Sequence, residues 1–202
     1  MKKMLVVLLV ALVAVFSVNA MGPEFGIKGG LVLGNVVWGE ENGDFEGLDN
    51  PLKFGLTGGI MMEMPMGPIS LGAEVLYTQK GEKYTFEEEG DLLINLKLDY
   101  IEVPVMAKLN LLPIVKVYGG VSFGFLTTAE EIVEIDGEEV DSMDLKDFIN
   151  TTEMGAIMGV QVKISKLVLD ARYNHGLTDI MKDNEGDAVN LRTLYATVGF
   201  MF

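Results

Sequence analysis

Apolar and polar residues alternate with a period of two along most of the chain after residue 24. In the first such segment Phe25, Ile27 and Leu31 share one face, while Lys28 lies on the other. This alternation is typical of a β-strand that separates an apolar phase from a polar one. The same rule predicts eight strands, at residues 25–33, 52–64, 69–80, 101–109, 115–125, 153–163, 167–174 and 191–202.

The links between these strands alternate in length. Short turns join the second strand to the third, the fourth to the fifth and the sixth to the seventh, and the long links are rich in Gly, Asp and Glu. An even-numbered up-and-down barrel with both chain ends on one side has this pattern, with short periplasmic turns and longer outer loops. The long links are residues 39–51, 82–91, 129–150 and 181–190.

Two all-β folds fit this pattern, a soluble barrel of lipocalin type and a membrane barrel with its apolar face outward. Basic and acidic residues are mixed on the polar faces, which suits a packed ionic interior, whereas a Lys or Arg facing lipid near the midplane costs about 2–4 kcal/mol. We therefore predict an eight-stranded antiparallel up-and-down transmembrane β-barrel. Its expected lumen ionic network comprises Lys28, Lys53, Glu63, Glu74, Lys80, Glu102, Lys108, Lys116, Glu153, Lys163, Asp170 and Arg172.

The N-terminal segment has a different composition. Lys2 and Lys3 precede thirteen apolar residues, 4–16, and small residues end at Ala20. This arrangement predicts a cleaved secretory signal peptide over residues 1–20, leaving residues 21–202 as the barrel domain. The alternative, a retained helical anchor, requires about 20 apolar residues to cross a bilayer.

Composition excludes several function classes. The formal net charge is -15, which disfavours nucleic-acid binding because phosphate contacts need clustered Lys and Arg. The chain has no cysteine, so it has neither disulfides nor thiolate metal sites.

Several short motifs resemble one known family. They are GIKGGL at residues 26–31, YTQKG at 77–81, YIEVPV at 100–105, LDARY at 169–173 and GLTDI at 176–180. In this order they resemble the PorT-like outer-membrane β-barrel family, although Glu153 stands where an Asp is common. The resemblance implies an eight-stranded barrel in a Gram-negative outer membrane, in contact with lipid and lipopolysaccharide. The final GFMF resembles the signal read by barrel-insertion machinery, carried by Phe200 and Phe202.

The candidate sites give little chemistry. An eight-stranded barrel is just wide enough to be filled by its own side chains, so the lumen charges predict a solid plug. The acidic loops are interpreted as solvated, and the alternative is weak Ca²⁺ or Mg²⁺ binding that bridges them to lipopolysaccharide. The residues for that alternative are Asp136, Glu138, Glu139, Asp141, Asp183, Glu185 and Asp187.

An enzyme is not expected. His175 is the single histidine, and neither a Ser nor an Asp is marked as its partner, although Asp170, Asp179 and Asp183 are near in sequence. The sequence predicts no catalytic residue, cofactor or resident metal. We expect a structural or surface-interaction protein of the envelope with an unidentified surface partner. The alternatives are a narrow transport channel and an accessory factor in envelope assembly or protein secretion.

Overall fold

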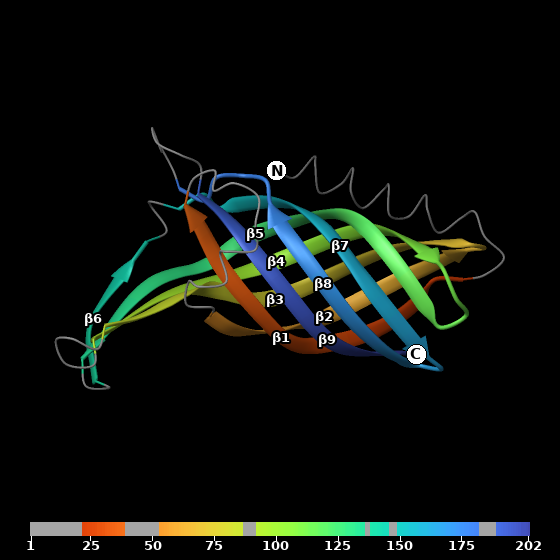
Figure 1. Cartoon of the computed structure of the whole chain (residues 1–202), viewed down its shortest axis with the longest axis horizontal. Helices are drawn as coiled ribbons and strands as arrows, with labels where there is room; N and C mark the ends of the chain where they lie inside the picture. The colour runs from red at the N-terminus through yellow and green to blue at the C-terminus, as the bar shows by residue number, and fades with distance from the viewer. Residues whose placement is uncertain (1–21, 39–52, 87–91, 136–137, 146–148, 182–188) are drawn as a thin grey trace.

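The computed structural model describes residues 22–38, 53–86, 92–135, 138–145, 149–181 and 189–202, and these residues form nine strands (Figure 1). The expected signal peptide lies outside the described residues. Within the described part, no helix is long and apolar enough to cross a membrane. The strands are β1 (Glu24–Trp38), β2 (Lys53–Met66), β3 (Ile69–Phe86), β4 (Leu92–Asn110), β5 (Val115–Ile135), β6 (Glu138–Asp144), β7 (Thr152–Ile164), β8 (Leu167–Gly176) and β9 (Val189–Met201).

Eight of these strands close into an antiparallel barrel in the order β1, β2, β3, β4, β5, β7, β8 and β9. The closing pair joins the two ends of the chain, with Leu31 of β1 opposite Ala196 of β9. The backbone N–H of Phe202 also donates a hydrogen bond to the carbonyl of Phe25, at 2.8 Å. The prediction of a closed eight-stranded barrel is confirmed. Closure leaves no barrel edge unpaired, as a bilayer requires.

The strands expose their apolar face on the outside of the barrel. Along β9 buried and exposed residues alternate from Leu191 to Met201, and the exposed positions are Leu194, Ala196, Val198 and Phe200. Phe54 is 72% exposed, and Ile60 and Met158 are each 61% exposed. A soluble barrel of lipocalin type would bury this face, so the outward apolar surface decides between the two all-β folds.

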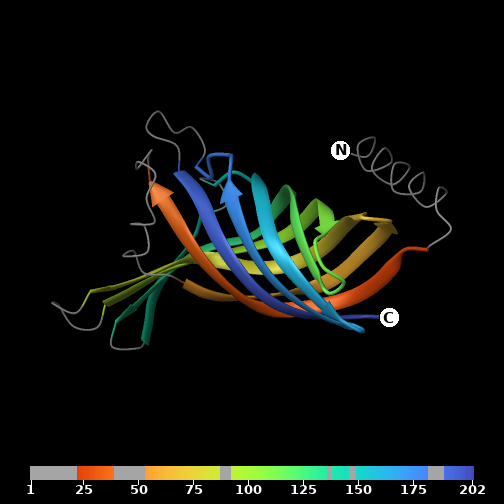
Figure 2. The ribbon, with the colours of Figure 1, turned by 45° about the vertical axis from the view of Figure 1, so that its right-hand side comes forward.

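One part of the loop prediction is wrong. Residues 82–86 belong to β3, and much of the expected loop 129–150 is the end of β5 and the whole of β6. Beyond the barrel, β3, β4 and β5 continue and are joined by β6 in a four-stranded antiparallel sheet, with Lys83 opposite Asn95 and Ile132 opposite Ser142. Figures 1 and 2 show this sheet projecting from one end of the barrel. The dense acidic residues hid the strand signal of Ile132, Val133 and Ile135.

An apolar cluster lies at the loop end of the barrel. This cluster includes residues from two of the predicted long links, 129–150 and 181–190. The isolated β-bridge between Ile149 and Met181 joins these two segments. Asn150 stabilises this bridge, because its side-chain amide donates hydrogen bonds to the backbone carbonyls of Asp179 and Met181 at 2.9 and 3.1 Å. We call this cluster the apolar cap; its buried members are Leu98, Tyr100, Ala129, Ile149, Ile180, Val189 and Leu191.

Candidate functional site

The inward side chains of the barrel form three stacked polar layers. The strands alternate their side chains between lipid and lumen, so charged residues at every second position meet in the interior. We name the layers by their place: the turn-end layer near the short turns, the middle layer, and the outer layer beneath the apolar cap.

The middle layer joins four charged side chains from three strands. Lys28 of β1 donates to Glu74 of β3 and to Asp170 of β8, both at 3.1 Å. Arg172 of β8 reaches across to Glu74 at 2.7 Å. Tyr118 of β5 donates to Asp170 at 2.7 Å and accepts from Arg172 Nε at 3.1 Å. Two positive and two negative charges are thus matched, and each of the four charged side chains is only 2% exposed.

Gly159 of β7 creates the space that Tyr118 occupies. A Cβ atom at Gly159 would lie 2.4 Å from both Cζ and Oη of the tyrosine. The absence of a side chain there lets the phenol of Tyr118 pass over β7 and reach Asp170 on β8.

The turn-end layer is centred on Glu63 of β2. Lys108 of β4 donates to Glu63 at 3.0 Å and to Gln161 of β7 at 2.6 Å. Lys116 of β5 also pairs with Glu63. Two lysines therefore share one carboxylate, and this layer carries one positive charge in excess.

The outer layer reverses this balance. Lys80 of β3 lies between two carboxylates, 2.6 Å from Glu102 of β4 and 2.9 Å from Glu153 of β7. Glu102 also accepts hydrogen bonds from Thr78 at 2.8 Å and from Tyr195 at 2.9 Å. One lysine here faces two carboxylates, so this layer carries one negative charge in excess.

The layers explain how a narrow barrel can bury many charges. The middle layer draws mainly on β1, β3, β5 and β8, which are alternate strands around the barrel, and the other two layers draw largely on the strands between them. Aromatic rings lie against two of the lysines, with Lys80 Nζ 5.0 Å from the Tyr100 ring and Lys108 Nζ 5.8 Å from the Tyr118 ring. Pairing offsets the desolvation cost of these buried charges. The lumen is therefore a packed core in which paired charges lie beside buried apolar side chains such as Met61, Met106 and Ile157.

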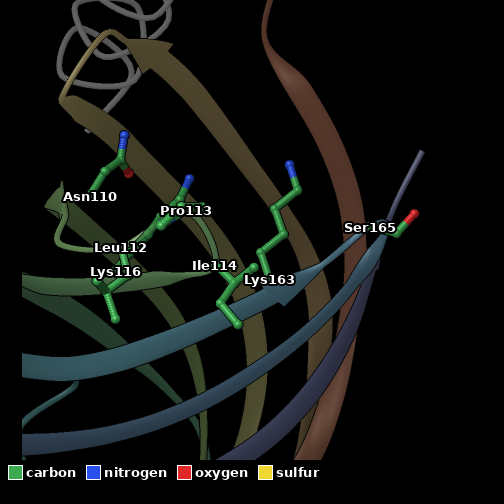
Figure 3. Close-up of a pocket in the computed structure, with 7 residues that line it drawn as sticks. All are labelled: Asn110, Leu112, Pro113, Ile114, Lys116, Lys163 and Ser165. Atoms are coloured by element: carbon green, nitrogen blue, oxygen red, sulfur yellow. The ribbon is translucent and has the colours of Figure 1, made fainter.

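A shallow pocket of about 420 Å³ lies at the turn end of the barrel. It is formed by the turns between β4 and β5 and between β7 and β8 (Figure 3). Its two lysines already have carboxylate partners, since Lys116 pairs with Glu63 and Lys163 lies 2.5 Å from Glu24. The pocket therefore presents no unpaired basic group. It is lined by Asn110, Leu112, Pro113, Ile114, Lys116, Lys163 and Ser165.

The twelve expected lumen residues fall into three groups. Lys116 is partly exposed and Lys163 lies at the rim, while β2 begins at Lys53, whose side chain is outside the described part. The other nine are buried and bonded to one another in the layers: Lys28, Glu63, Glu74, Lys80, Glu102, Lys108, Glu153, Asp170 and Arg172. No role in the lumen network was predicted for Tyr118, Tyr195 and Gln161, although all three side chains lie on the inward faces of their strands.

The other expected sites are placed less completely. His175 lies on the outward face of β8, with Nδ1 3.3 Å from the Tyr173 hydroxyl. Glu138, Glu139 and Asp141 belong to β6, whereas Asp136, Asp183, Glu185 and Asp187 lie outside the described residues. Phe200 and Phe202 contact each other at the lipid-facing end of β9, with ring centroids 6.2 Å apart. Within the described ranges, no group of three or more His, Cys, Asp or Glu side chains could hold a metal ion.

A family model described as an outer membrane protein beta-barrel domain matches residues 21–182 of the chain. The chain belongs to this outer-membrane β-barrel family. The exposed apolar belt of the barrel is therefore its lipid-facing surface, and the protein resides in the outer membrane. No curated protein matches the chain.

Solved outer-membrane barrels share the fold. The Ail protein of Yersinia pestis, crystallised with the heparin analogue sucrose octasulfate, is 17% identical, with a TM-score of 0.50 over 90% of this chain and 100% of Ail. Neisserial surface protein A is 16% identical, with a TM-score of 0.54 over 90% of this chain and 100% of that protein. The two TM-scores support a shared barrel architecture. At these low identities, the ligand of a solved structure is not assigned to this chain.

Proposed function

We propose that this outer-membrane barrel is a non-catalytic surface-interaction protein. In this proposal the projecting sheet is the binding platform and the barrel is its anchor. The observation that carries the proposal is the continuation of β3 to β6 beyond the barrel as a four-stranded sheet. A structural role in the membrane alone does not require strands that extend past the apolar belt.

The projecting sheet offers open edges in the described part of the chain. Strand β6 pairs with β5 alone, and the β3 residues from Gly81 to Phe86 pair with β4 alone. An unpaired strand edge presents N–H and C=O groups that can accept another strand. Strand addition of this kind is a general mode of peptide recognition.

The end of β5 from Glu130 and the strand β6 form a hairpin, and the charge of this hairpin selects the partner. From residue 130 to residue 144 the sequence has no Lys or Arg and contains Glu130, Glu131, Glu134, Asp136, Glu138, Glu139, Asp141 and Asp144. Opposite charge attracts a partner and steers its approach. We therefore propose that the ligand is an extended segment rich in Lys and Arg.

The packed lumen favours this function over a narrow channel. Nine charged side chains from the lumen walls are buried and paired with one another, so a hydrated solute would have to displace a bonded network. The same proposal has four further parts. The barrel is PorT-like, it is exported through a signal peptide, it is inserted through a signal carried by Phe200 and Phe202, and it contacts lipopolysaccharide. Weak Ca²⁺ or Mg²⁺ binding by the acidic loops is a further part of it.

Trimming the hairpin tests the platform. Residues 131–143 are replaced by Asn-Gly, which joins Glu130 to its cross-strand partner Asp144 and favours a tight turn. The probe is a fluorescent peptide of alternating Lys and Val, and its binding to protein in nanodiscs is followed by anisotropy. The trimmed barrel should keep the faster gel migration of an unheated folded barrel and bind the peptide far more weakly, because the β3 edge that remains lacks the acidic segment.

A second variant separates charge from strand addition. Replacing Glu131, Glu134, Glu138 and Glu139 by Gln leaves the strand edge and removes much of the negative charge. It should weaken binding and make it less sensitive to salt. Equal binding of the Lys peptide by the full and trimmed proteins, or equal binding of a Glu and Val peptide, would contradict the proposal.

A further inference from the structure

The outer layer contains buried oxygen atoms that lack partners. Four inward side chains have an oxygen with no hydrogen-bond partner within the part of the chain that the structure describes: Glu153 Oε1, Asn174 Oδ1, Thr193 Oγ1 and Tyr100 Oη. Their residues are 6%, 2%, 1% and 0% exposed. Buried oxygens of this kind are normally bonded to protein, water or an ion. The presence of four such oxygens in one layer indicates a bound ligand.

These oxygens come from neighbouring inward positions. Asn174 of β8 lies directly opposite Thr193 of β9. On the other side of Asn174, its Oδ1 atom lies 2.1 Å from the place that a Cβ atom of Gly155 in β7 would take. Glu153 is the next inward residue of β7, and its Oε1 lies 3.5 Å from the equivalent point of Gly176. Gly155 and Gly176 are paired across β7 and β8, and their missing side chains leave room for these two oxygens on neighbouring strands.

Tyr100 completes the same wall from the next strands. The space beside Gly124 of β5 lies between Tyr100 and Glu153: a Cβ atom there would be 3.2 Å from Tyr100 Cδ1 and 3.3 Å from Glu153 Oε2. Tyr100 also belongs to the apolar cap that covers the layer. The unpartnered oxygens are therefore close to apolar side chains and buried away from bulk water.

The charge of the layer indicates the charge of the ligand. Glu102 is neutralised by Lys80 and saturated by Thr78 and Tyr195, whereas Glu153 shares the same lysine through Oε2 and leaves Oε1 bare. One negative charge is unmatched. Carboxylate, amide and hydroxyl oxygens are hard ligands that suit hard cations. A single monovalent cation balances this charge, whereas a divalent ion would leave a positive excess.

We propose that the outer layer binds one alkali-metal cation, held by Glu153 Oε1 and the neutral oxygens of Asn174, Thr193 and Tyr100. Water can complete its coordination. This site does not depend on the surface-binding function, because it lies beneath the apolar cap and inside the barrel. It differs from the acidic-loop hypothesis in its residues and in the charge of its ion.

The first test compares salts at equal ionic strength. Refolded protein in detergent is heated in NaCl, KCl or N-methylglucamine chloride, and the midpoint at which the fast-migrating folded band disappears is recorded. Equal ionic strength keeps screening the same, so a specific ion raises the midpoint only by binding the folded state. The midpoint should rise with Na⁺ or K⁺ concentration and stay constant with N-methylglucamine.

Two variants locate the effect. Glu153→Gln should abolish the dependence on alkali ion, and Glu24→Gln, which removes a carboxylate at the turn-end rim, should preserve it. The second measurement needs no variant: crystals grown with Rb⁺ or Tl⁺ in place of Na⁺ should show an anomalous peak beside Glu153 Oε1. Identical midpoints in all three salts, or a peak-free layer that contains water alone, would overturn the proposal.

Discussion

Arg172 and Glu74 meet at 2.7 Å across the full width of the barrel. Arg172 is on β8 and Glu74 is on β3, and three barrel strands separate these two strands in either direction. A direct contact between opposite walls means that the lumen at this level is spanned by side chains. The pair therefore ties the barrel together as well as neutralising its interior.

Removing Arg172 should destabilise the barrel strongly. Arg172→Met leaves Lys28 as the one basic side chain bonded to Glu74 and Asp170, and breaking a buried pair costs about 3–5 kcal/mol. The free energy of unfolding is measured with urea in detergent micelles through the single tryptophan, Trp38. The control is Lys163→Met at the rim, whose partly exposed pair with Glu24 is worth at most about 1 kcal/mol. An equal loss of unfolding free energy in the two variants would contradict the pairing described for the middle layer.

Gly159 should tolerate no side chain. Gly159→Ala places a methyl group against the Tyr118 hydroxyl and moves it from Asp170, and overpacking of this kind costs about 1–3 kcal/mol. Gly119→Ala is the matched control, because the nearest atom to its Cβ is the Ile157 carbonyl oxygen at 3.7 Å. Urea midpoints should fall for the first variant and hold for the second. A similar midpoint for both would show that Tyr118 has another way into the lumen.

The folded barrel should not conduct. Its three layers fill the lumen with bonded side chains, and the apolar cap covers the loop end. In planar bilayers with KCl, insertion of the purified protein should leave the current at the baseline of the lipid. The trimmed hairpin variant should behave in the same way, because it keeps the layers. A stable conductance that passes hydrated solutes would restore the channel alternative.

The final residue should affect insertion more than stability. Phe202 is 69% exposed and its side chain faces lipid, much like Phe54, which is 72% exposed. Phe202→Ala should slow assembly by purified insertion machinery in liposomes, whereas Phe54→Ala should not. Both should change the free energy of unfolding to a similar small extent, because both side chains are largely exposed on the lipid side of the barrel. Normal assembly of the Phe202 variant would remove the proposed C-terminal signal.

The sequence predicted the barrel because each strand obeys one rule. Phe25, Ile27 and Leu31 face lipid and Lys28 faces the lumen, and repetition of this rule fixes both strand number and facing. The lumen network was predicted as a set, but its pairing was not. Arg172 and Glu74 are 98 residues apart, and their contact depends on the closed register of all strands between them.

The loop end was predicted less well for a different reason. Acidic residues dominate residues 129–150, so the hydrophobic pattern of Ile132, Val133 and Ile135 was read as part of a solvated loop. The apolar cap was missed because Ile149 and Ile180 belong to pairs of apolar residues, 148–149 and 180–181, which are too short to show a periodic pattern. Only the fold shows that such residues converge over the barrel mouth.

Cysteine labelling on intact cells tests the central claim most directly, since the chain has no native cysteine. Ser142→Cys places a thiol in β6 of the projecting sheet, and Leu112→Cys places one in the exposed turn between β4 and β5. A membrane-impermeant maleimide should label the Ser142 variant on intact cells and the Leu112 variant only after the outer membrane is permeabilised. Labelling of the Leu112 variant on intact cells with protection of the Ser142 variant would contradict the account, because the projecting sheet would then face the periplasm.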